Sequence, residues 1–216
     1  MEALSPEKRA QILQGAARIF AQDGYEGASM SRIATEANVS KGTLYNHFES
    51  KADLFAAFVQ QEARCRLSQI FCAVDGDDDP AETLRHIARQ MIEMTLSSHI
   101  MTIYRVVIAE ASKFPDLAKI FFDAGPANAI RGMREWLAQE AGRGRLTVED
   151  PEFAAEQFLA LCQTRIGFRR RLRVGPEPSQ DDISRVVEAS VAMFLHSYGP
   201  EVSKTPCPST PRPSTP

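Results

Sequence analysis

The sequence predicts an all-α protein of about nine helices, with a three-helix N-terminal domain (residues 1–51) and a larger helical domain (residues 52–198). Apolar residues recur at spacings of three and four over most of the chain, as they do along one face of a helix. Serine, aspartate or proline precedes many of these segments, in the positions where helices are capped. Two short helical segments joined by a tight turn lie near the N-terminus.

The first helix is expected to begin at Pro6, with Ser5 as its N-cap, because proline is well suited to the first helical position. Gly24 is expected to end it. Its apolar face carries residues at helical spacing, which are Ile12, Leu13, Ala16, Ala17 and Phe20.

The next two segments, Met30–Ala37 and Lys41–Phe48, predict two short helices. Two serines precede them as N-caps and two residues connect them, namely Ser29, Ser40, Asn38 and Val39. This arrangement predicts a helix-turn-helix, in which Leu44 and Phe48 of the second helix point into the core.

The remaining positions of the second helix carry small and polar groups that suit the major groove of DNA, whose walls are phosphate. They are Lys41, Gly42, Thr43, Tyr45, Asn46 and His47. Lys51 opens the following helix. The alternative for any single one of these residues is an ordinary solvent-facing position, and only the whole pattern favours DNA binding.

The segment MSRIATEANVSKGTLYNHFESKADLF resembles the DNA-binding signature of the TetR family of bacterial regulators, over roughly the first 60 residues. The resemblance implies a homodimer that binds a palindromic operator in double-stranded DNA. It also implies groove contacts from Lys41, Gly42, Thr43 and Asn46, and phosphate contacts from Tyr45, His47 and Lys51.

The formal charge of −3 predicts that any attraction to DNA is local. Its expected sources are the helix N-termini and five cations, Lys8, Arg9, Arg32, Lys41 and Lys51. Neither an apolar run long enough to cross a membrane nor a secretion signal is apparent, so the sequence predicts a cytoplasmic protein with no membrane partner.

Ser50 and Asp53 form a capping signal for a long fourth helix that runs to about Val74 and links the two domains. Asp75, Asp77 and Asp79 follow, and their alternation suggests a calcium loop. That interpretation is disfavoured, because Pro80 and His86 stand where an EF-hand needs glycine and glutamate. A solvated acidic turn before a helix at Pro80 is preferred.

Behind this turn the sequence predicts two apolar helices, then a segment at Asp116–Ala141 with a kink or break at Gly125 and Pro126. Two more helices are expected, from Pro151 to about Arg171 and from Asp181 to about His196. The stretches KFPDLAKIFFDAGP and DPEFAAEQFLAL resemble the ligand domain of AefR-like regulators. In that family the last helices join two subunits.

An apolar or amphiphilic small molecule is expected to bind among helices four to eight. The candidate lining residues are Phe58, Met91, Met94, His99, Tyr104, Phe121, Phe122 and Phe158, with Gln157 as a further polar contact. For each residue taken alone, ordinary core packing remains the favoured alternative. The arginines between Arg165 and Arg173 are expected to stabilise a helix C-terminus, pair with Asp181 and Asp182, or rim a dimer interface, in preference to binding nucleic acid.

No motif predicts catalysis, a metal or a cofactor, because the four histidines, His47, His86, His99 and His196, are far apart. The cysteines, Cys65, Cys72, Cys162 and Cys207, are expected to be free thiols, with a redox pair at 65 and 72 as the minor alternative. Residues 199–216 predict a disordered tail. Together, the expected DNA contacts and the expected ligand predict a homodimeric repressor that its ligand releases from the operator. The alternatives are an activator, a partner-controlled regulator, an architectural DNA-binding protein and an all-helical enzyme.

Overall fold

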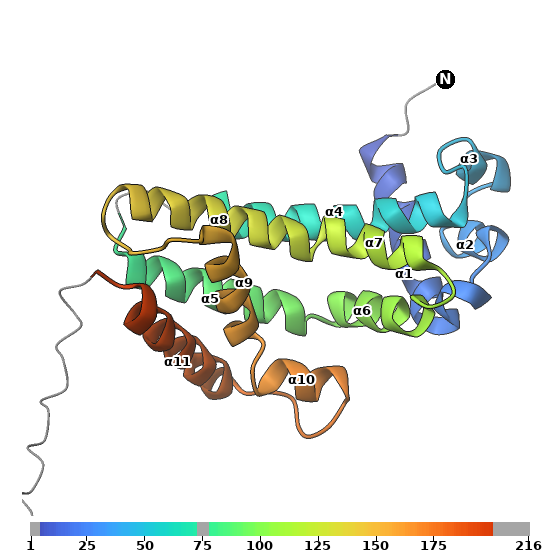
Figure 1. The fold of residues 1–216 in the computed structure, drawn as a ribbon. Coiled ribbons are helices and arrows are strands. Elements are labelled where there is room, and N and C mark those ends of the chain that lie inside the picture. The colour runs from blue at the N-terminus through green and yellow to red at the C-terminus, as the bar shows by residue number, and fades with distance from the viewer. Residues whose placement is uncertain (1–4, 73–77, 201–216) are drawn as a thin grey trace, which may run out of the picture.

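The computed structural model describes residues 5–72 and 78–200. Within these ranges the chain forms eleven helices and no strand, so the all-α prediction is confirmed. The helices, drawn in Figure 1, are α1 (Pro6–Gly27), α2 (Met30–Glu36), α3 (Lys41–Tyr45), α4 (Lys51–Cys72), α5 (Pro80–Leu96), α6 (Ser98–Glu110), α7 (Pro115–Ala124), α8 (Pro126–Gly142), α9 (Pro151–Cys162), α10 (Ile166–Arg171) and α11 (Gln180–Tyr198).

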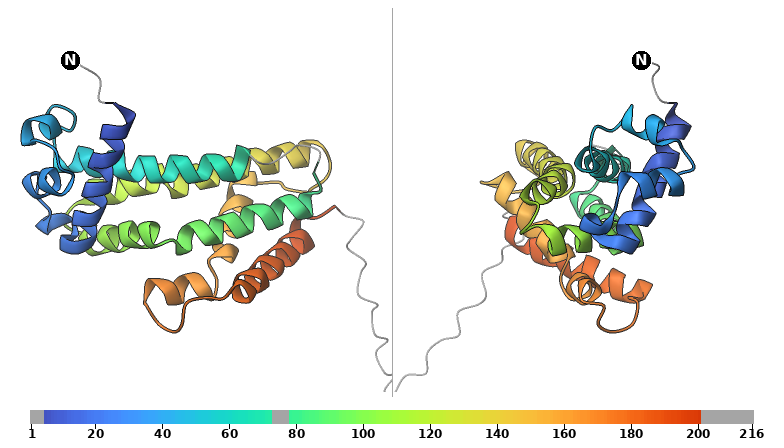
Figure 2. Two further views of the ribbon diagram at one scale, coloured as in Figure 1. Left: turned by 180° about the vertical axis from the view of Figure 1, so that it is seen from behind. Right: turned by 90° about the vertical axis from the view of Figure 1, so that its right-hand side faces the viewer.

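Helices α1 to α3 form a head at one end of an elongated helical body (Figure 1). In the body, α4 runs beside α7 and α8, while α5 and α6 follow one another along the opposite side. Helix α9 connects the two sides, and α11 packs against α5 and α9. Both views in Figure 2 show α10 and α11 at the edge of the body, away from α3.

Side-chain caps place the head helices where the sequence predicts them. The hydroxyl oxygens of Ser5, Ser29 and Ser40 accept hydrogen bonds from the backbone N–H groups three residues later, over 3.3, 3.2 and 2.9 Å. Asn38 adopts a left-handed conformation (φ 51°), which turns the chain sharply between α2 and α3. The helix-turn-helix geometry therefore follows from local sequence.

Close packing holds the head together. A Cβ atom on Gly15 would lie 2.7 Å from the Ala37 Cβ, so α1 and α2 can approach this closely only with glycine there. The Phe20 ring meets Phe55 of α4 edge-on at 5.2 Å, and Tyr25 meets Phe55 at 5.6 Å. The N-terminal part of α4 is thus fixed to the head core.

The described part of the chain forms two more helices than the nine predicted. Gly125 separates α7 from α8, which is the break expected before Pro126. The single helix predicted from Pro151 to Arg171 is wrong, because it is divided at Arg165, which has a φ of 60°. Thr164 donates its hydroxyl hydrogen to the Leu161 carbonyl over 2.7 Å and helps to end α9 there.

Several predictions fall outside the described residues. These concern Val74, Asp75, Asp77, Cys207 and the tail beyond residue 200, together with the side chains of Cys65 and Cys72. Asp79 is described, and its carboxylate accepts from the Ala81 N–H over 3.1 Å as the cap of α5. Cys162 is buried as a free thiol.

Candidate functional site

Helix α3 presents a polar face to solvent, built on two buried anchors. Leu44 and Phe48 are 0% and 2% exposed and belong to the head core. The remaining predicted DNA contacts of this segment stay accessible: Lys41, Gly42, Tyr45 and Asn46 are exposed, and Thr43 and His47 are half-buried. Six of the seven predicted residues are therefore accessible to solvent on α3 and the turn that follows it.

The predicted helix from Lys41 to Phe48 is shorter in the structure. It ends at Tyr45, and Asn46 is its C-cap, with the Asn46 N–H donating to the Gly42 carbonyl over 2.9 Å. The Phe48 N–H still donates to the Leu44 carbonyl over 3.0 Å, so a helical turn continues the path. The Asn46 and His47 side chains consequently follow the end of the helix instead of lying within it.

Gly42 is not required by packing within the protein. An added Cβ would meet only the Ser40 Oγ, at 3.7 Å, which is ordinary van der Waals contact. Glycine disfavours a helix by about 1 kcal/mol relative to alanine. At position 42 it therefore lowers the stability of α3, and no packing contact within the protein requires it. A close approach of DNA to the α3 backbone would account for it.

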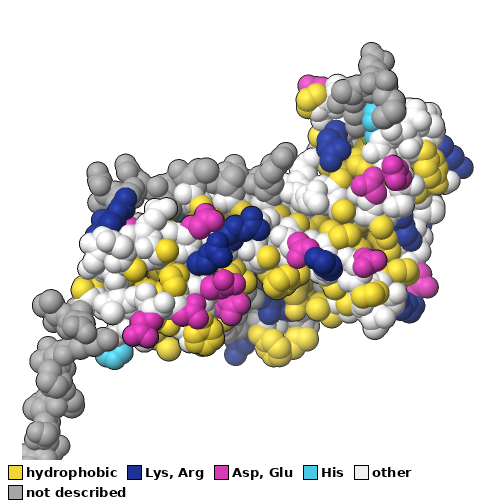
Figure 3. All heavy atoms as spheres, turned by 45° about the horizontal axis from the view of Figure 1, so that its top comes forward, with side chains coloured by type: hydrophobic (Ala, Val, Ile, Leu, Met, Phe, Trp, Pro, Cys, Tyr) yellow, Lys and Arg dark blue, Asp and Glu magenta, His cyan; other side chains and the backbone are white. Residues whose placement is uncertain are grey.

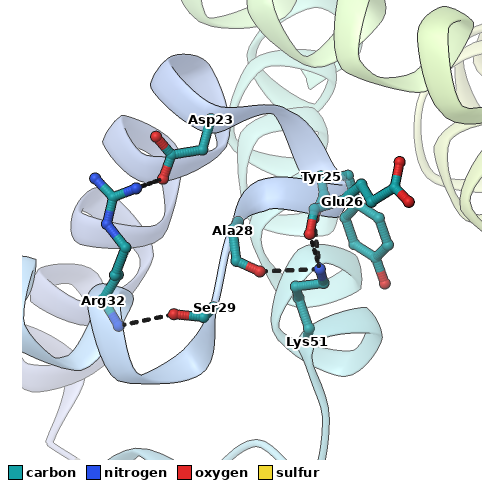
Figure 4. A network of polar contacts seen from close by, with 7 residues as sticks. All are labelled: Asp23, Tyr25, Glu26, Ala28, Ser29, Arg32 and Lys51. Atoms are coloured by element: carbon teal, nitrogen blue, oxygen red, sulfur yellow. Dashed lines mark hydrogen bonds and ion pairs between the residues drawn. The ribbon is translucent and has the colours of Figure 1, made fainter.

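Lys51 lies at the junction between α1 and α4, as Figure 4 shows. Its Nζ donates to the carbonyls of Tyr25, Glu26 and Ala28 over 2.5, 3.1 and 2.9 Å, and lies 4.6 Å from the centre of the Tyr25 ring. Desolvation lowers the pKa of this ammonium, against the opposing effect of Glu110 and Glu26. All three donors are engaged within the protein, which leaves none for a phosphate.

Part of the positive charge of the head is also neutralised by ion pairs within the protein. Arg32 pairs with Asp23, and Arg18 pairs with Glu36 through an Nε–Oε1 contact of 2.5 Å. Lys41 has no ion pair among the described residues. Acidic and basic side chains are mixed on the face drawn in Figure 3, so the attraction to DNA has to come from single cations beside α3.

A second site is an apolar cavity of about 320 Å³ in the body. Its walls come from α4, α5, α6, α7, α8, α9 and α10, and most lining groups are apolar. Three turns of α4 contribute Val59, Ala63 and Leu67, which are spaced by four residues along one face. The helix that begins in the head therefore also forms a wall of the cavity.

Five of the predicted ligand contacts meet around this cavity, namely Met91, Met94, Tyr104, Phe121 and Phe122. The other three belong elsewhere. Phe58 and His99 line a separate groove between α1, α4 and α6, because they lie on the side of their helices that faces the head. Phe158 is completely buried against Phe194, with ring centres 5.0 Å apart, so it is a core residue.

Sequence reasoning missed the polar end of the cavity. Arg171 of α10 donates to the Gln163 side-chain oxygen, and its guanidinium carbon lies 5.0 Å from the centre of the Tyr104 ring. All three residues line the cavity. The arginine-rich stretch was visible in the sequence, but the break at Arg165 that turns Arg171 toward the cavity was not.

Gln157, predicted as another polar contact, instead accepts a hydrogen bond from the Tyr198 hydroxyl over 2.5 Å. Among the described residues no ion pair joins the arginines between Arg165 and Arg173 to Asp181 or Asp182. Three of these arginines lie in the last turn of α10, as the predicted role at a helix C-terminus requires. Arg170 pairs with Glu177 through an Nη1–Oε1 contact of 2.6 Å.

The fold and the α3 surface define a helix-turn-helix protein whose body carries an apolar cavity. The family model described as bacterial regulatory proteins, tetR family, matches residues 12–58, and the model of the AefR-like transcriptional repressor C-terminal domain matches residues 82–200. The chain belongs to the TetR family of transcriptional regulators. The resemblance expected from the sequence is confirmed over both domains.

Curated relatives agree with this assignment. The repressor AcnR of Corynebacterium efficiens is 27% identical over 83% of this chain and 88% of its own length. Two shorter matches, to AcnR of Corynebacterium diphtheriae and to the activator FasR of Mycolicibacterium smegmatis, are each 38% identical. These shorter matches span only 33% and 36% of those two proteins.

Solved structures show the same architecture. A TetR-family regulator from Mesorhizobium loti superposes with a TM-score of 0.82 at 26% identity, over 92% of this chain and all of that one. The flavonoid-responsive regulator FrrA superposes with a TM-score of 0.78 at 29% identity, over 91% of this chain and 99% of that one. Among the described helices of this protein, none combines the length and the hydropathy needed to span a bilayer.

Proposed function

We propose that this TetR-family regulator is a cytoplasmic homodimeric repressor that binds a palindromic operator and is released by an apolar or amphiphilic small molecule. The main support is α4, because one helix is fixed to the head through Lys51 and lines the cavity through Val59, Ala63 and Leu67. A molecule that moves the middle of α4 would change the position of the head. Nothing in this arrangement calls for catalysis.

The exposed faces of α9 and α11 support dimerisation. Phe153 of α9 and Met193 of α11 are 55% and 59% exposed, although both are large and apolar. Ala160, Ala189 and Ala192 are exposed on the same two helices, and small residues let helices approach closely. Pairing these faces between two subunits would bury the apolar groups in a four-helix interface.

The dimer would present two α3 helices to DNA. Helix-turn-helix dimers read half-sites one turn of DNA apart, about 34–36 Å. In this proposal Lys41, Gly42, Thr43 and Asn46 contact the groove, and Tyr45 and His47 contact phosphate. All six residues are exposed or half-buried, so each is accessible to DNA.

A second connection between head and body supports ligand control. The Glu110 carboxylate at the end of α6 accepts from the Glu26 N–H over 3.3 Å, and Lys113 pairs with the Glu26 carboxylate over 2.5 Å. Phe114 meets the Tyr25 ring at 5.1 Å. Helix α6 carries Ile103 and Tyr104 of the cavity, so a change there would reach the head through this turn.

The test is a fluorescence anisotropy titration on an operator selected from a randomised duplex library. Candidate ligands that bind the cavity are expected to weaken operator binding, while the variant Lys41→Met is expected to weaken it without changing ligand affinity. Unchanged operator affinity at saturation with every ligand that binds would refute release by ligand. A monomer at working concentration in sedimentation would refute the dimer.

Activation is the second candidate, because the relative FasR is named an activator. An activator would use the same surface and cavity, and would differ in where its operator lies relative to the promoter. A reporter gene with the selected operator placed upstream of or over the promoter separates the two roles. Loss of expression on deleting the regulator would favour activation.

A further inference from the structure

We propose that the molecule bound in this cavity is an organic acid, an apolar body carrying one anionic group that Arg171 binds. This rests on the proposed function of the cavity and specifies its ligand. The geometry points to it because the cavity is apolar along α4, α7 and α8 but ends at a guanidinium from α10. A guanidinium is the side chain best suited to hold a carboxylate or sulfonate through two parallel hydrogen bonds.

Arg171 has donors to spare. It carries five N–H donors, and its only hydrogen bond among the described residues goes to the Gln163 side-chain oxygen. Among the described residues, no carboxylate lies within ion-pair distance of the Arg171 guanidinium. The side chain is half-buried, so its charge is partly desolvated without the anionic partner that normally compensates such a charge.

The neighbours of Arg171 hold it in place. The Tyr104 ring lies under the guanidinium at 5.0 Å, and the Phe121 ring meets Tyr104 at 6.3 Å at an angle of 68°. Gln163 fixes one end of the guanidinium. The Tyr104 hydroxyl has no hydrogen bond among the described residues and is a further donor to an anion.

The surroundings of α10 favour negative charge. A second pocket on the other side of this helix is lined by five further arginines and two carboxylates, so positive charge is in excess there. These residues are Arg105, Arg165, Arg169, Arg170, Arg173, Glu177 and Asp182. The pKa of Arg105 is lowered by desolvation and by the positive charges of Arg173 and Arg170. Such a field attracts anions toward the α10 end.

Among the described residues that line the cavity, Glu156 is the one carboxylate, and it lies away from Arg171. It lies on α9, seven residues before the C-cap Gln163, which is two helical turns or roughly 10 Å along the axis. A bound acid would therefore place its anionic group beside α10 and its apolar body between α4, α7 and α8. A cationic amphiphile would meet Arg171 instead and be repelled.

A matched pair of fluorescent probes tests this on the full-length protein. 1-Anilinonaphthalene-8-sulfonate and N-phenyl-1-naphthylamine share one ring system and differ by the sulfonate. We expect the anionic probe to bind the wild-type protein about 10- to 100-fold more tightly than the neutral one, as a charge-assisted hydrogen bond would give. Mutual displacement would establish that both occupy one site.

Substitutions on α10 distinguish a direct contact between Arg171 and the anion from a contribution of Arg171 to the shape of the cavity wall. Arg171→Met keeps an unbranched apolar side chain at this position and is expected to abolish most of the preference, with the affinity for the neutral probe changed less than about twofold. Arg169→Met is the matched control, since Arg169 lies two residues away, is exposed and lines the second pocket. It is expected to leave both affinities within about twofold, apart from a small loss of field.

Three results would overturn the inference. One is an equal loss of affinity for both probes in Arg171→Met, which would mean that Arg171 only forms part of the cavity wall. Another is an equal effect of Arg169→Met, and the third is a wild-type protein without preference for the anionic probe. Should Arg171→Met fail to fold, Arg171→Lys and the salt dependence of the wild-type preference serve instead, because a charge contact weakens with salt and an apolar contact does not.

Probe binding also distinguishes this inference from the proposed function. If neither probe binds and operator affinity is insensitive to every ligand, the cavity itself has no role, and both are refuted. If the neutral probe binds and releases DNA while the anionic probe binds no more tightly than the neutral one, release by ligand is supported and the specificity for acids is refuted.

Discussion

Lys51 and Lys41 are ten residues apart at the DNA-binding end of the protein, and exchanging each for methionine separates a structural role from a DNA contact. The Lys51 ammonium has three carbonyl partners at 2.5, 2.9 and 3.1 Å, whereas the Lys41 side chain has no hydrogen bond among the described residues. A net charged hydrogen bond contributes about 1.5–3 kcal/mol. Because one partly exposed ammonium makes all three contacts, we expect Lys51→Met to cost ~3 kcal/mol in total.

For a chain of this size that loss lowers the melting temperature by roughly 6–12 °C. Lys41→Met should leave the melting temperature unchanged, since the side chain is exposed. Operator binding and its salt dependence should change in Lys41→Met and stay nearly the same in Lys51→Met. A lysine in the groove also neutralises phosphates on the groove walls. Each neutralised phosphate that is lost reduces the slope of log K against log salt by about 0.9, so Lys41→Met in both subunits gives a reduction of up to about 1.8.

Differential scanning calorimetry and anisotropy titrations at four salt concentrations measure both quantities. The reasoning is refuted if Lys51→Met reduces the salt slope as Lys41→Met does and leaves the melting temperature intact. In that case the three carbonyl contacts would be worth nothing, and Lys51 would be the phosphate contact that the sequence predicts. Lys51→Arg, which keeps the charge, is the control for electrostatic effects that do not depend on these contacts.

Three further substitutions and one labelling experiment test other parts of the structure. Gly42→Ala should keep or raise stability by up to ~1 kcal/mol in thermal unfolding, yet weaken operator binding by an overpacking cost of about 1–3 kcal/mol. Glu140→Ala should cost about 2–4 kcal/mol in urea unfolding, because the carboxylate is 1% exposed and pairs with Arg145 over 2.6 Å. Met193→Glu should weaken the proposed dimer at least tenfold in sedimentation, because it would place a charge in the proposed interface. Burial raises the pKa of the Cys162 thiol to about 12, so only about 1 in 10⁴ is thiolate at pH 8, and iodoacetamide should not label it in the folded protein.

Local signals in the sequence predicted the head well. Each cap in α1, α2 and α3 is a serine that bonds a backbone group three residues later, so a short window contains all the necessary information. The break at Gly125 is likewise local, because proline follows it. Helical periodicity also identified the residues that meet at the cavity from α5, α6 and α7.

The missed features depend on contacts between distant residues. Lys51 bonds carbonyls that lie 23 to 26 positions earlier, and no pattern around it indicates that its ammonium turns inward. Arg171 reaches Tyr104 across the body only because the chain reverses at Arg165. Phe58 and Phe158 have the same apolar character as the residues that do line the cavity, and only their orientation in the folded protein separates them.

The coupling free energy between ligand binding and DNA binding sets how much more apolar surface must be buried around the ligand in the DNA-free state. Moving the dimer from almost fully bound to almost fully free takes about 5.5 kcal/mol of differential affinity, or ~2.8 kcal/mol for each of two ligands. At roughly 25 cal/mol per Å² of apolar surface, this equals about 110 Å² of extra burial in the DNA-free state. One side of a cavity wall such as Val59, Ala63 and Leu67 can supply an area of that order. In a series of acids that lengthens by one methylene, release of the operator should therefore strengthen by up to ~0.8 kcal/mol per step until the cavity is full. A series in which binding tightens while release stays constant would show that the apolar wall of α4 does not distinguish the two states.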